Sequence, residues 1–150
     1  MQKSKIKNKN YNLKFKNKRL LKDAIDFHGH LGPYLVLGIL MGELAIKKLR
    51  CKKHFGIGAI VRGAIKKPVS CLIDGIQIST GCTYGKGNIE KKNGKTIQVL
   101  FKNLQNNKGI RINLNKNLIV RLGHLNGHKE SEAFARGLLK TNYINLFEVN

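Results

Sequence analysis

Two histidines, a cysteine and an aspartate stand at spacings that allow them to act together. His28 and His30 flank Gly29 at the start of a turn rich in glycine and proline. Because glycine tolerates almost any backbone φ, both imidazoles can converge on one point. Imidazole is a common metal ligand and titrates close to neutral pH. Cys71 and Asp74 are three residues apart in a predicted helix, so they share one face of it.

Cys82 follows that helix in a glycine-rich loop, Gly81 to Asn88. A metal site is one prediction: a divalent ion such as zinc would have as ligands His28, His30, Cys71 and Cys82. A metal-free thiol enzyme is the second: Cys82 would be the nucleophile, with His28 or His30 as base. In either case Asp74 is expected to orient an imidazole. A plainer interpretation also stays open, in which the histidines bond local backbone groups and Cys71 is a buried core residue.

The loop that contains Cys82 is not a phosphate loop of the nucleotide-binding kind. It is one residue too short, and Gly87 stands where a magnesium-binding serine or threonine would be needed. It is expected instead to hold an anion through backbone N–H groups, Gly85 and the Lys86 ammonium. His124 and His128 are predicted to lie in a solvated loop, since glycines flank them.

Helices and short strands must position these groups. Hydrophobic periodicity predicts helices over 18–27, 33–52, 69–79 and 129–141, and strands over 56–65, 95–103, 108–114 and 146–149. The second helix begins at Pro33 and is apolar around its whole circumference at first, as buried helices are. Gly38 and Gly42 would let another element approach it closely. We therefore expect an α+β domain with a buried central helix packed on a mixed or antiparallel sheet.

The composition is strongly basic, with 29 Lys+Arg against 8 Asp+Glu and a formal net charge of +21. Such a field attracts polyanions and anionic small molecules. Residues 1–17 are predicted to be a basic, partly disordered arm in which Tyr11–Phe15 adds an edge strand, and residues 18–150 a single domain. Binding of nucleic acid by this arm is an open alternative. The same excess of lysine also arises where position is unconstrained.

The compartment can be predicted from the cysteines and the apolar runs. The three cysteines are an odd number, which argues against a disulfide framework and for a reducing, cytoplasmic location. No apolar run reaches the length of a membrane span, and no secretory signal is recognised, so no membrane association is expected.

Three motifs in order resemble the E-subunit family of formylmethanofuran dehydrogenase. The first is Phe27-His28-Gly29-His30-Leu31-Gly32-Pro33, the second Cys71-x-x-Asp74-Gly75-Ile76-Gln77, and the third Thr80-Gly81-Cys82-Thr83-Tyr84-Gly85-Lys86-Gly87-Asn88. The resemblance covers about residues 20–149. It implies an α-β-α-β-β-β core, a homodimer, and a pocket where the histidines meet Cys82. It also implies a link to anaerobic archaeal C1 metabolism and association with formylmethanofuran dehydrogenase.

The chain departs from the family pattern at the first motif. Family members often read His-Gly-His-x-Cys-Pro-Gly, whereas Gly32 stands here in the cysteine's place and Tyr34 in the place of the last glycine. One thiolate ligand is thereby missing, and Tyr34 is expected to narrow the pocket or to offer a phenol to the ligand. The Cys-rich zinc-binding tail of many members is also absent from this sequence. The sequence leaves open whether the chain is an enzyme.

Overall fold

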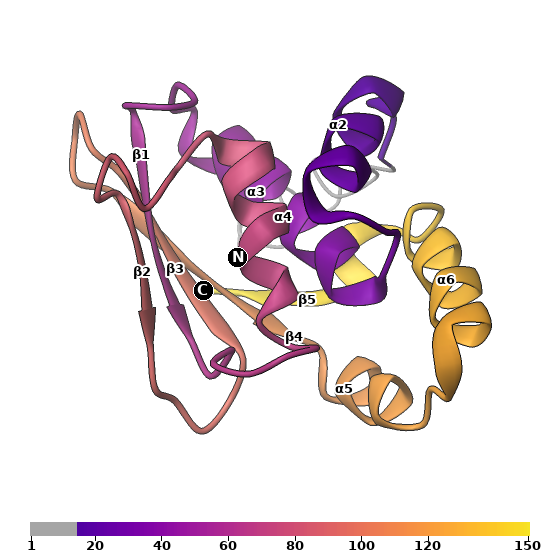
Figure 1. Ribbon diagram of the computed structural model, residues 1–150. Coiled ribbons are helices and arrows are strands. Elements are labelled where there is room, and N and C mark those ends of the chain that lie inside the picture. The colour runs from indigo at the N-terminus through magenta and orange to yellow at the C-terminus, as the bar shows by residue number, and fades with distance from the viewer. Residues whose placement is uncertain (1–14) are drawn as a thin grey trace.

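The computed structural model describes residues 15–150, and its centre is a five-stranded sheet in the order β2-β1-β3-β4-β5 (Figure 1). The strands are β1 (Ile57–Arg62), β2 (Ile89–Lys92), β3 (Gln98–Asn103), β4 (Gly109–Leu114) and β5 (Phe147–Val149). β1 and β2 pair in parallel and the other neighbours pair antiparallel. The sheet is therefore mixed.

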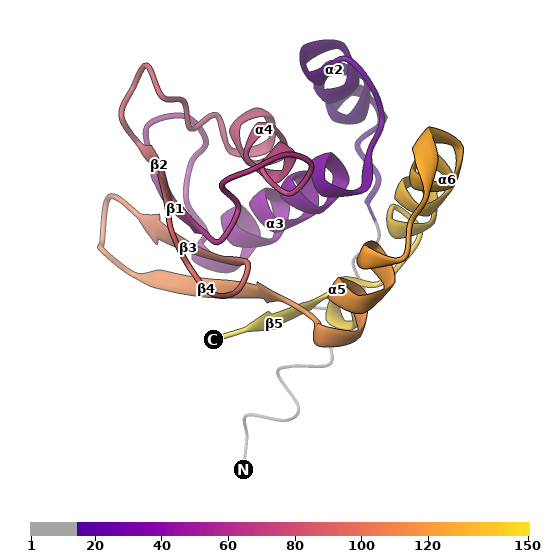
Figure 2. The ribbon, with the colours of Figure 1, turned by 60° about the horizontal axis from the view of Figure 1, so that its bottom comes forward.

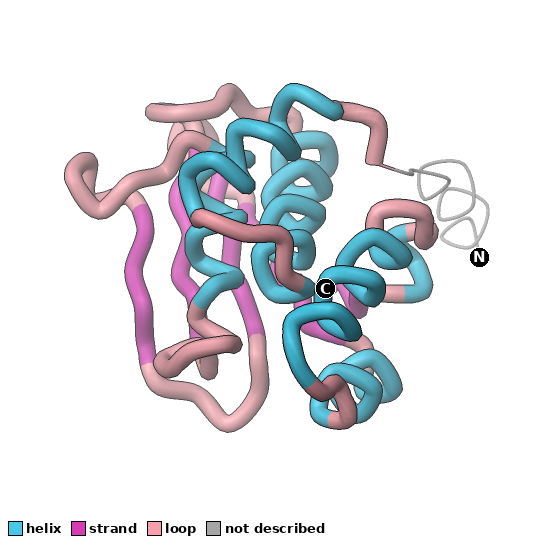
Figure 3. The backbone as a smooth tube through the Cα atoms, turned by 45° about the vertical axis from the view of Figure 1, so that its right-hand side comes forward, coloured by secondary structure: helices cyan, strands magenta, loops and turns pink. Residues whose placement is uncertain are grey.

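The helices lie on one face of this sheet (Figure 3). They are α2 (Lys18–His28), α3 (Pro33–Leu49), α4 (Cys71–Thr80), α5 (Lys116–Gly123) and α6 (Gly127–Leu138), followed by the short 3₁₀ helix η1 (Tyr143–Asn145). Along β1 and β3 buried residues alternate with more exposed ones, as expected for strands covered on one side only. The order α3-β1-α4-β2-β3-β4 confirms the expected α-β-α-β-β-β core and the α+β class.

The central helix α3 is buried because almost every residue in its first turns is apolar. Leu35, Val36, Leu37, Ile39, Leu40 and Met41 are all fully buried. α4 crosses α3 where glycines face each other: a Cβ on Gly38 would collide with the Leu72 carbonyl oxygen, and one on Gly75 with the carbonyl oxygen of Leu35. The predicted close approach at Gly38 is confirmed, and it lets α4 lie directly against the start of α3.

Two elements were not predicted. β2 has one buried side chain, Ile89, followed by exposed Glu90, Lys91 and Lys92, so it lacks the alternation that marks a strand. Pairing with β1 alone makes it extended. α5 begins after Asn115, whose side chain accepts a hydrogen bond from the Asn117 backbone N–H, and it buries Leu118 and Leu122. The arm at 1–17, with its edge strand at Tyr11–Phe15, lies almost wholly outside the described residues.

Within residues 15–150, no helix combines the length and the apolar character that crossing a membrane requires.

Candidate functional site

A hydrogen bond between His28 and Asp74 joins two helices at the centre of the candidate site. α2 ends at His28, where Gly29 takes φ +106° and returns its N–H to the Ile25 carbonyl. Asp74 lies in the first turn of α4, which the glycine crossing holds near α3. His28 Nδ1 lies 2.6 Å from Asp74 Oδ2, and the two side chains are 9% and 35% exposed. The predicted orienting role of Asp74 thus has a direct geometric basis.

This hydrogen bond leaves the other ring nitrogen of His28 available. A carboxylate oxygen can only accept, so Nδ1 carries the proton and donates it. Nε2 is then the acceptor, and it is buried with no hydrogen-bond partner. Buried polar atoms are nearly always bonded in folded proteins, so an unpartnered one calls for an explanation such as an absent ligand, ion or water.

Two further imidazoles lie beside His28. The rings of His28 and His30 have centroids 4.8 Å apart with planes tilted by 35°. His30 in turn meets His128 of α6 edge to face, with centroids 6.2 Å apart. His128 is therefore not in a solvated loop, as the sequence suggested, but in the first turn of a helix that packs across the histidine turn. Sequence reasoning missed this residue because it lies far along the chain from His30.

These side chains line a cavity of about 680 Å³ between α2, α3, α4 and α6. Its polar wall includes His28, His30, His128, Cys71 and Tyr34. Its apolar wall includes Ile25, Leu31, Pro68, Leu122 and Leu125. An apolar hollow with a few convergent polar groups is the usual form of a small-molecule site.

Cys71 and Tyr34 present protonated groups to this cavity. Burial raises the pKa of the Cys71 thiol, and the nearby Asp74 carboxylate raises it further, whereas Lys67 partly opposes this. Burial likewise raises the pKa of the Tyr34 phenol. Both groups therefore favour their neutral forms near neutral pH. Cys71 is a weak nucleophile in this state, although a bound metal ion would displace its proton.

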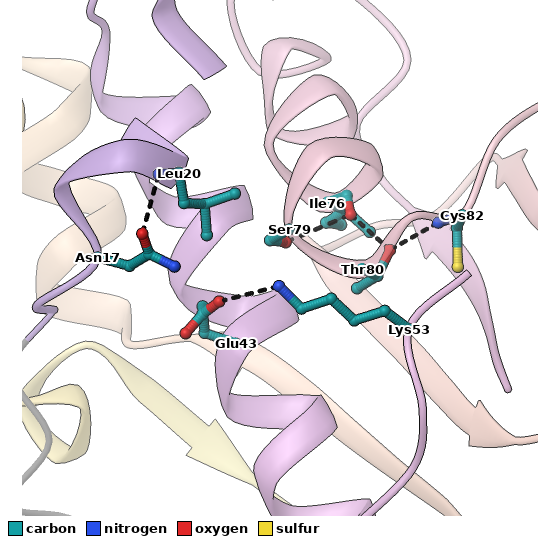
Figure 4. Close-up of polar contacts among 8 residues, drawn as sticks. All are labelled: Asn17, Leu20, Glu43, Lys53, Ile76, Ser79, Thr80 and Cys82. Carbon is teal, nitrogen blue, oxygen red and sulfur yellow. Dashed lines mark hydrogen bonds and ion pairs between the residues drawn. The ribbon is translucent and has the colours of Figure 1, made fainter. Parts of the chain in front are cut away.

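The predicted meeting of Cys82 with the histidines does not occur within this subunit. Cys82 is fully buried, and its thiol donates to the Ile57 carbonyl at 3.3 Å. Its backbone N–H donates to Thr80 Oγ1, at the end of α4 (Figure 4). Cys71 and Cys82 lie at opposite ends of this helix, whose length is roughly 15 Å at 1.5 Å per residue. Burial also raises the pKa of the Cys82 thiol.

Lys86 and Gly85 lie in the same loop as Cys82, and neither lines the cavity. The loop's N–H groups are used internally: those of Lys86 and Gly87 donate to the Thr83 carbonyl at 3.2 and 3.1 Å. The Lys86 ammonium lies 5.5 Å from the centre of the Phe55 ring. The loop is thus closed on itself, and the predicted anion cradle has no free N–H from these two residues.

No cluster of three or more His, Cys, Asp or Glu side chains is arranged to hold a metal ion in the described part of the chain. The polar groups that the structure does bring together are His28, His30, His128, Asp74 and Cys71. They combine an oriented imidazole, a further pair of imidazoles and a thiol around one cavity. Such a set can accept a proton or ligate an ion at His28 Nε2.

Two known proteins share parts of this chain's sequence or fold. A probable S-adenosyl-L-methionine-binding protein of Archaeoglobus fulgidus is 38% identical over 73 residues, which make up 47% of this chain and 20% of that protein. The chain thus spans a small part of this curated relative. An FmdE-like protein of tungsten formylmethanofuran dehydrogenase from Syntrophus aciditrophicus has the same fold, with a TM-score of 0.63 and 20% identity over 89% of this chain and 70% of that chain.

A family model matches most of the domain. The model is described as FmdE, molybdenum formylmethanofuran dehydrogenase operon, and it matches residues 27–142. The match begins one residue before the histidine turn and extends past the end of α6, so it includes all the residues that line the cavity except Ile25. The chain therefore belongs to the FmdE family.

Proposed function

We propose that this protein binds a small ligand, alone or with a divalent metal ion, at the Nε2 atom of His28. The observation that carries the proposal is the combination of two facts about one ring. Nδ1 is fixed by Asp74 at 2.6 Å, and Nε2 is buried without a partner beside a cavity of about 680 Å³. An imidazole oriented by a carboxylate is the usual arrangement of a metal-ligating or proton-accepting histidine.

The residues present fit a borderline-soft ion such as zinc. His28 and His30 would hold the ion, and Cys71, rather than Cys82, would be the nearby thiol. Since two imidazoles fill only part of a tetrahedral set, open positions would remain for a bound molecule or water, as in catalytic zinc sites. When bound, zinc acts as a Lewis acid toward the ligand that it contacts.

The same geometry serves a ligand that binds without a metal. His28 Nε2 would then accept a hydrogen bond or a proton from the ligand, and Asp74 would stabilise the imidazole as it charges. The Tyr34 hydroxyl, which faces the same cavity, would donate to the ligand in its protonated form. In this proposal Tyr34 fills the cofactor-binding role that was also predicted for Lys86 and Gly85.

The Archaeoglobus relative makes S-adenosyl-L-methionine the first organic molecule to test. The cavity lies within the range of about 300–1,000 Å³ that small-molecule sites occupy. Its apolar wall would accept the adenine ring, and its imidazoles the carboxylate.

The family description names the formylmethanofuran dehydrogenase operon. We propose that residues 18–150 form the ligand-binding domain of a cytoplasmic homodimer that acts in anaerobic archaeal C1 metabolism, in association with formylmethanofuran dehydrogenase. Light scattering coupled to gel filtration measures the number of protomers, and a monomer at micromolar concentration would contradict the dimer.

Cobalt(II) titration of the anaerobically prepared, metal-free protein tests the site. We expect ligand-field absorption that is lost in His28→Ala and weakened about 10- to 100-fold in Asp74→Asn, because the carboxylate orients the ligating ring. His124→Ala is the matched control, since His124 ends α5 and does not line the cavity. Isothermal titration with S-adenosyl-L-methionine tests the metal-free form with the same variants. If His28→Ala binds both probes as the wild type does, the proposal is wrong.

A further inference from the structure

Three loops meet at one end of the sheet, away from the cavity that holds the histidines. They are residues 51–56 before β1, residues 82–88 before β2, and residues 104–108 between β3 and β4 (Figures 1 and 2). We call their combined outer surface the loop surface. The proposed function uses none of these residues.

The loop surface exposes large apolar side chains, two of them aromatic. Phe55 is 79% exposed, Tyr84 53% and Leu104 45%. Phe55 is the most exposed large hydrophobic residue in the described chain, although core positions are available to phenylalanine elsewhere, as for Phe101. An exposed aromatic of this kind is a typical mark of a binding surface.

Hydrogen bonds between the loops hold these side chains in place. The Asn88 amide donates to the His54 carbonyl at 2.7 Å, and its oxygen accepts from the Thr83 N–H at 2.9 Å. The His54 N–H donates to the Thr80 carbonyl at 2.8 Å. The Leu104 N–H donates to the Gly56 carbonyl at 3.0 Å. Phe55 therefore projects from a backbone that is fixed on both sides.

Lysines surround the exposed aromatics, and the three loops contain no aspartate or glutamate. Exposed lysines at this end of the sheet are Lys52, Lys53, Lys86, Lys102 and Lys108. Glu43 engages one of them, Lys53, at 3.7 Å. Lys86 lies over the Phe55 ring, within cation–π distance. Positive charge and an aromatic face are thus presented together.

We propose that the loop surface binds single-stranded nucleic acid. Bases would stack on Phe55 and Tyr84, and lysines such as Lys86 would contact the phosphates. This combination of aromatic platforms with a basic rim is how proteins hold single strands without reading their sequence. A second copy of the chain is a poorer partner, since its lysines would face these lysines and repel them.

Binding of a labelled 16-nucleotide oligothymidylate, followed by fluorescence anisotropy at low salt, tests the stacking. We expect Phe55→Ala to weaken binding by about 5- to 150-fold, the effect of losing one stacked base. Inorganic polyphosphate, which has charge but no bases, should bind Phe55→Ala and the wild type alike. Phe27→Ala is the matched control, because Phe27 is 59% exposed on α2. Equal affinities of Phe55→Ala and wild type for the oligonucleotide would overturn the proposal.

The lysines are tested by the salt dependence of the same binding. For each phosphate that a variant no longer neutralises, the slope of log affinity against log salt should become shallower by about 0.7. The triple variant Lys86→Ala/Lys102→Ala/Lys108→Ala should therefore show a shallower slope, whereas Lys116→Ala/Lys129→Ala/Lys140→Ala, which removes the same charge from α5, α6 and the turn after α6, should not. Equal reductions in both triples, or a reduction only when Lys3, Lys5 and Lys7 of the arm are replaced, would mean that binding is unspecific or lies elsewhere and would overturn the proposal.

Discussion

Replacing Gly38 by alanine should destabilise the protein, although alanine is the better helix former. A Cβ on Gly38 would overlap the Leu72 carbonyl oxygen and lie 2.9 Å from the Leu72 carbonyl carbon and 3.0 Å from the Gly75 Cα. All three are backbone atoms of α4, so no side-chain rotation relieves the overlap. Helix propensity favours alanine by about 0.8–1 kcal/mol. Overpacking a close-packed interior costs about 1–3 kcal/mol or more, and here the helices must separate by roughly 1 Å.

The two effects together predict a net loss of about 1–2 kcal/mol in the free energy of unfolding, or roughly 2–8 °C in melting temperature for a domain of this size. Urea denaturation followed by circular dichroism measures it. Gly137→Ala is the matched control, because a Cβ there meets nothing within 4 Å, and it should stabilise α6 by up to about 1 kcal/mol. If Gly38→Ala proved as stable as the wild type, the packing of α4 on α3 described above would be wrong.

Three other substitutions test the site and the loops. Asp74→Asn removes the charge that helps to raise the pKa of Cys71, so peptide-resolved iodoacetamide labelling of Cys71 at pH 8 should accelerate; an unchanged rate would contradict the assigned cause. Gly32→Cys restores a thiol at a backbone φ of −134°, with its Cβ 3.3 Å from His30 Nε2, and should tighten zinc binding about tenfold or more in a competition titration. Asn88→Ala, which removes the amide that joins two loops, should cost about 1–3 kcal/mol in urea denaturation; no change would show that those loops are held otherwise.

Much of the fold could be predicted from periodicity. α3 was predictable because Pro33 fixes its start and its apolar residues cover the whole circumference. β2 was not, since its polar sequence becomes a strand only through pairing with β1. α5 did carry a local signal: Asn115 is a good N-cap, and Leu118 and Leu122 are four residues apart.

The candidate site was predictable where short spacing decided it, and not where tertiary placement did. Cys71 and Asp74 were correctly given a common helix, and His28 and His30 a common turn. Cys82 was misplaced because its sequence position says that it follows α4, but not that the helix points away from the histidines. His128 reaches the site only because α6 folds back onto α3, which no local pattern indicates.

The nitrogen atoms of His28 test the central claim most directly. A long-range ¹H–¹⁵N spectrum of labelled protein distinguishes a protonated Nδ1 from a protonated Nε2, and it reports any ligand that binds to either atom. We predict a proton on Nδ1, an unprotonated Nε2, and a change in the Nε2 resonance when zinc or the small ligand is added. A proton on Nε2, or an Nε2 signal that no added ligand moves, would contradict the account.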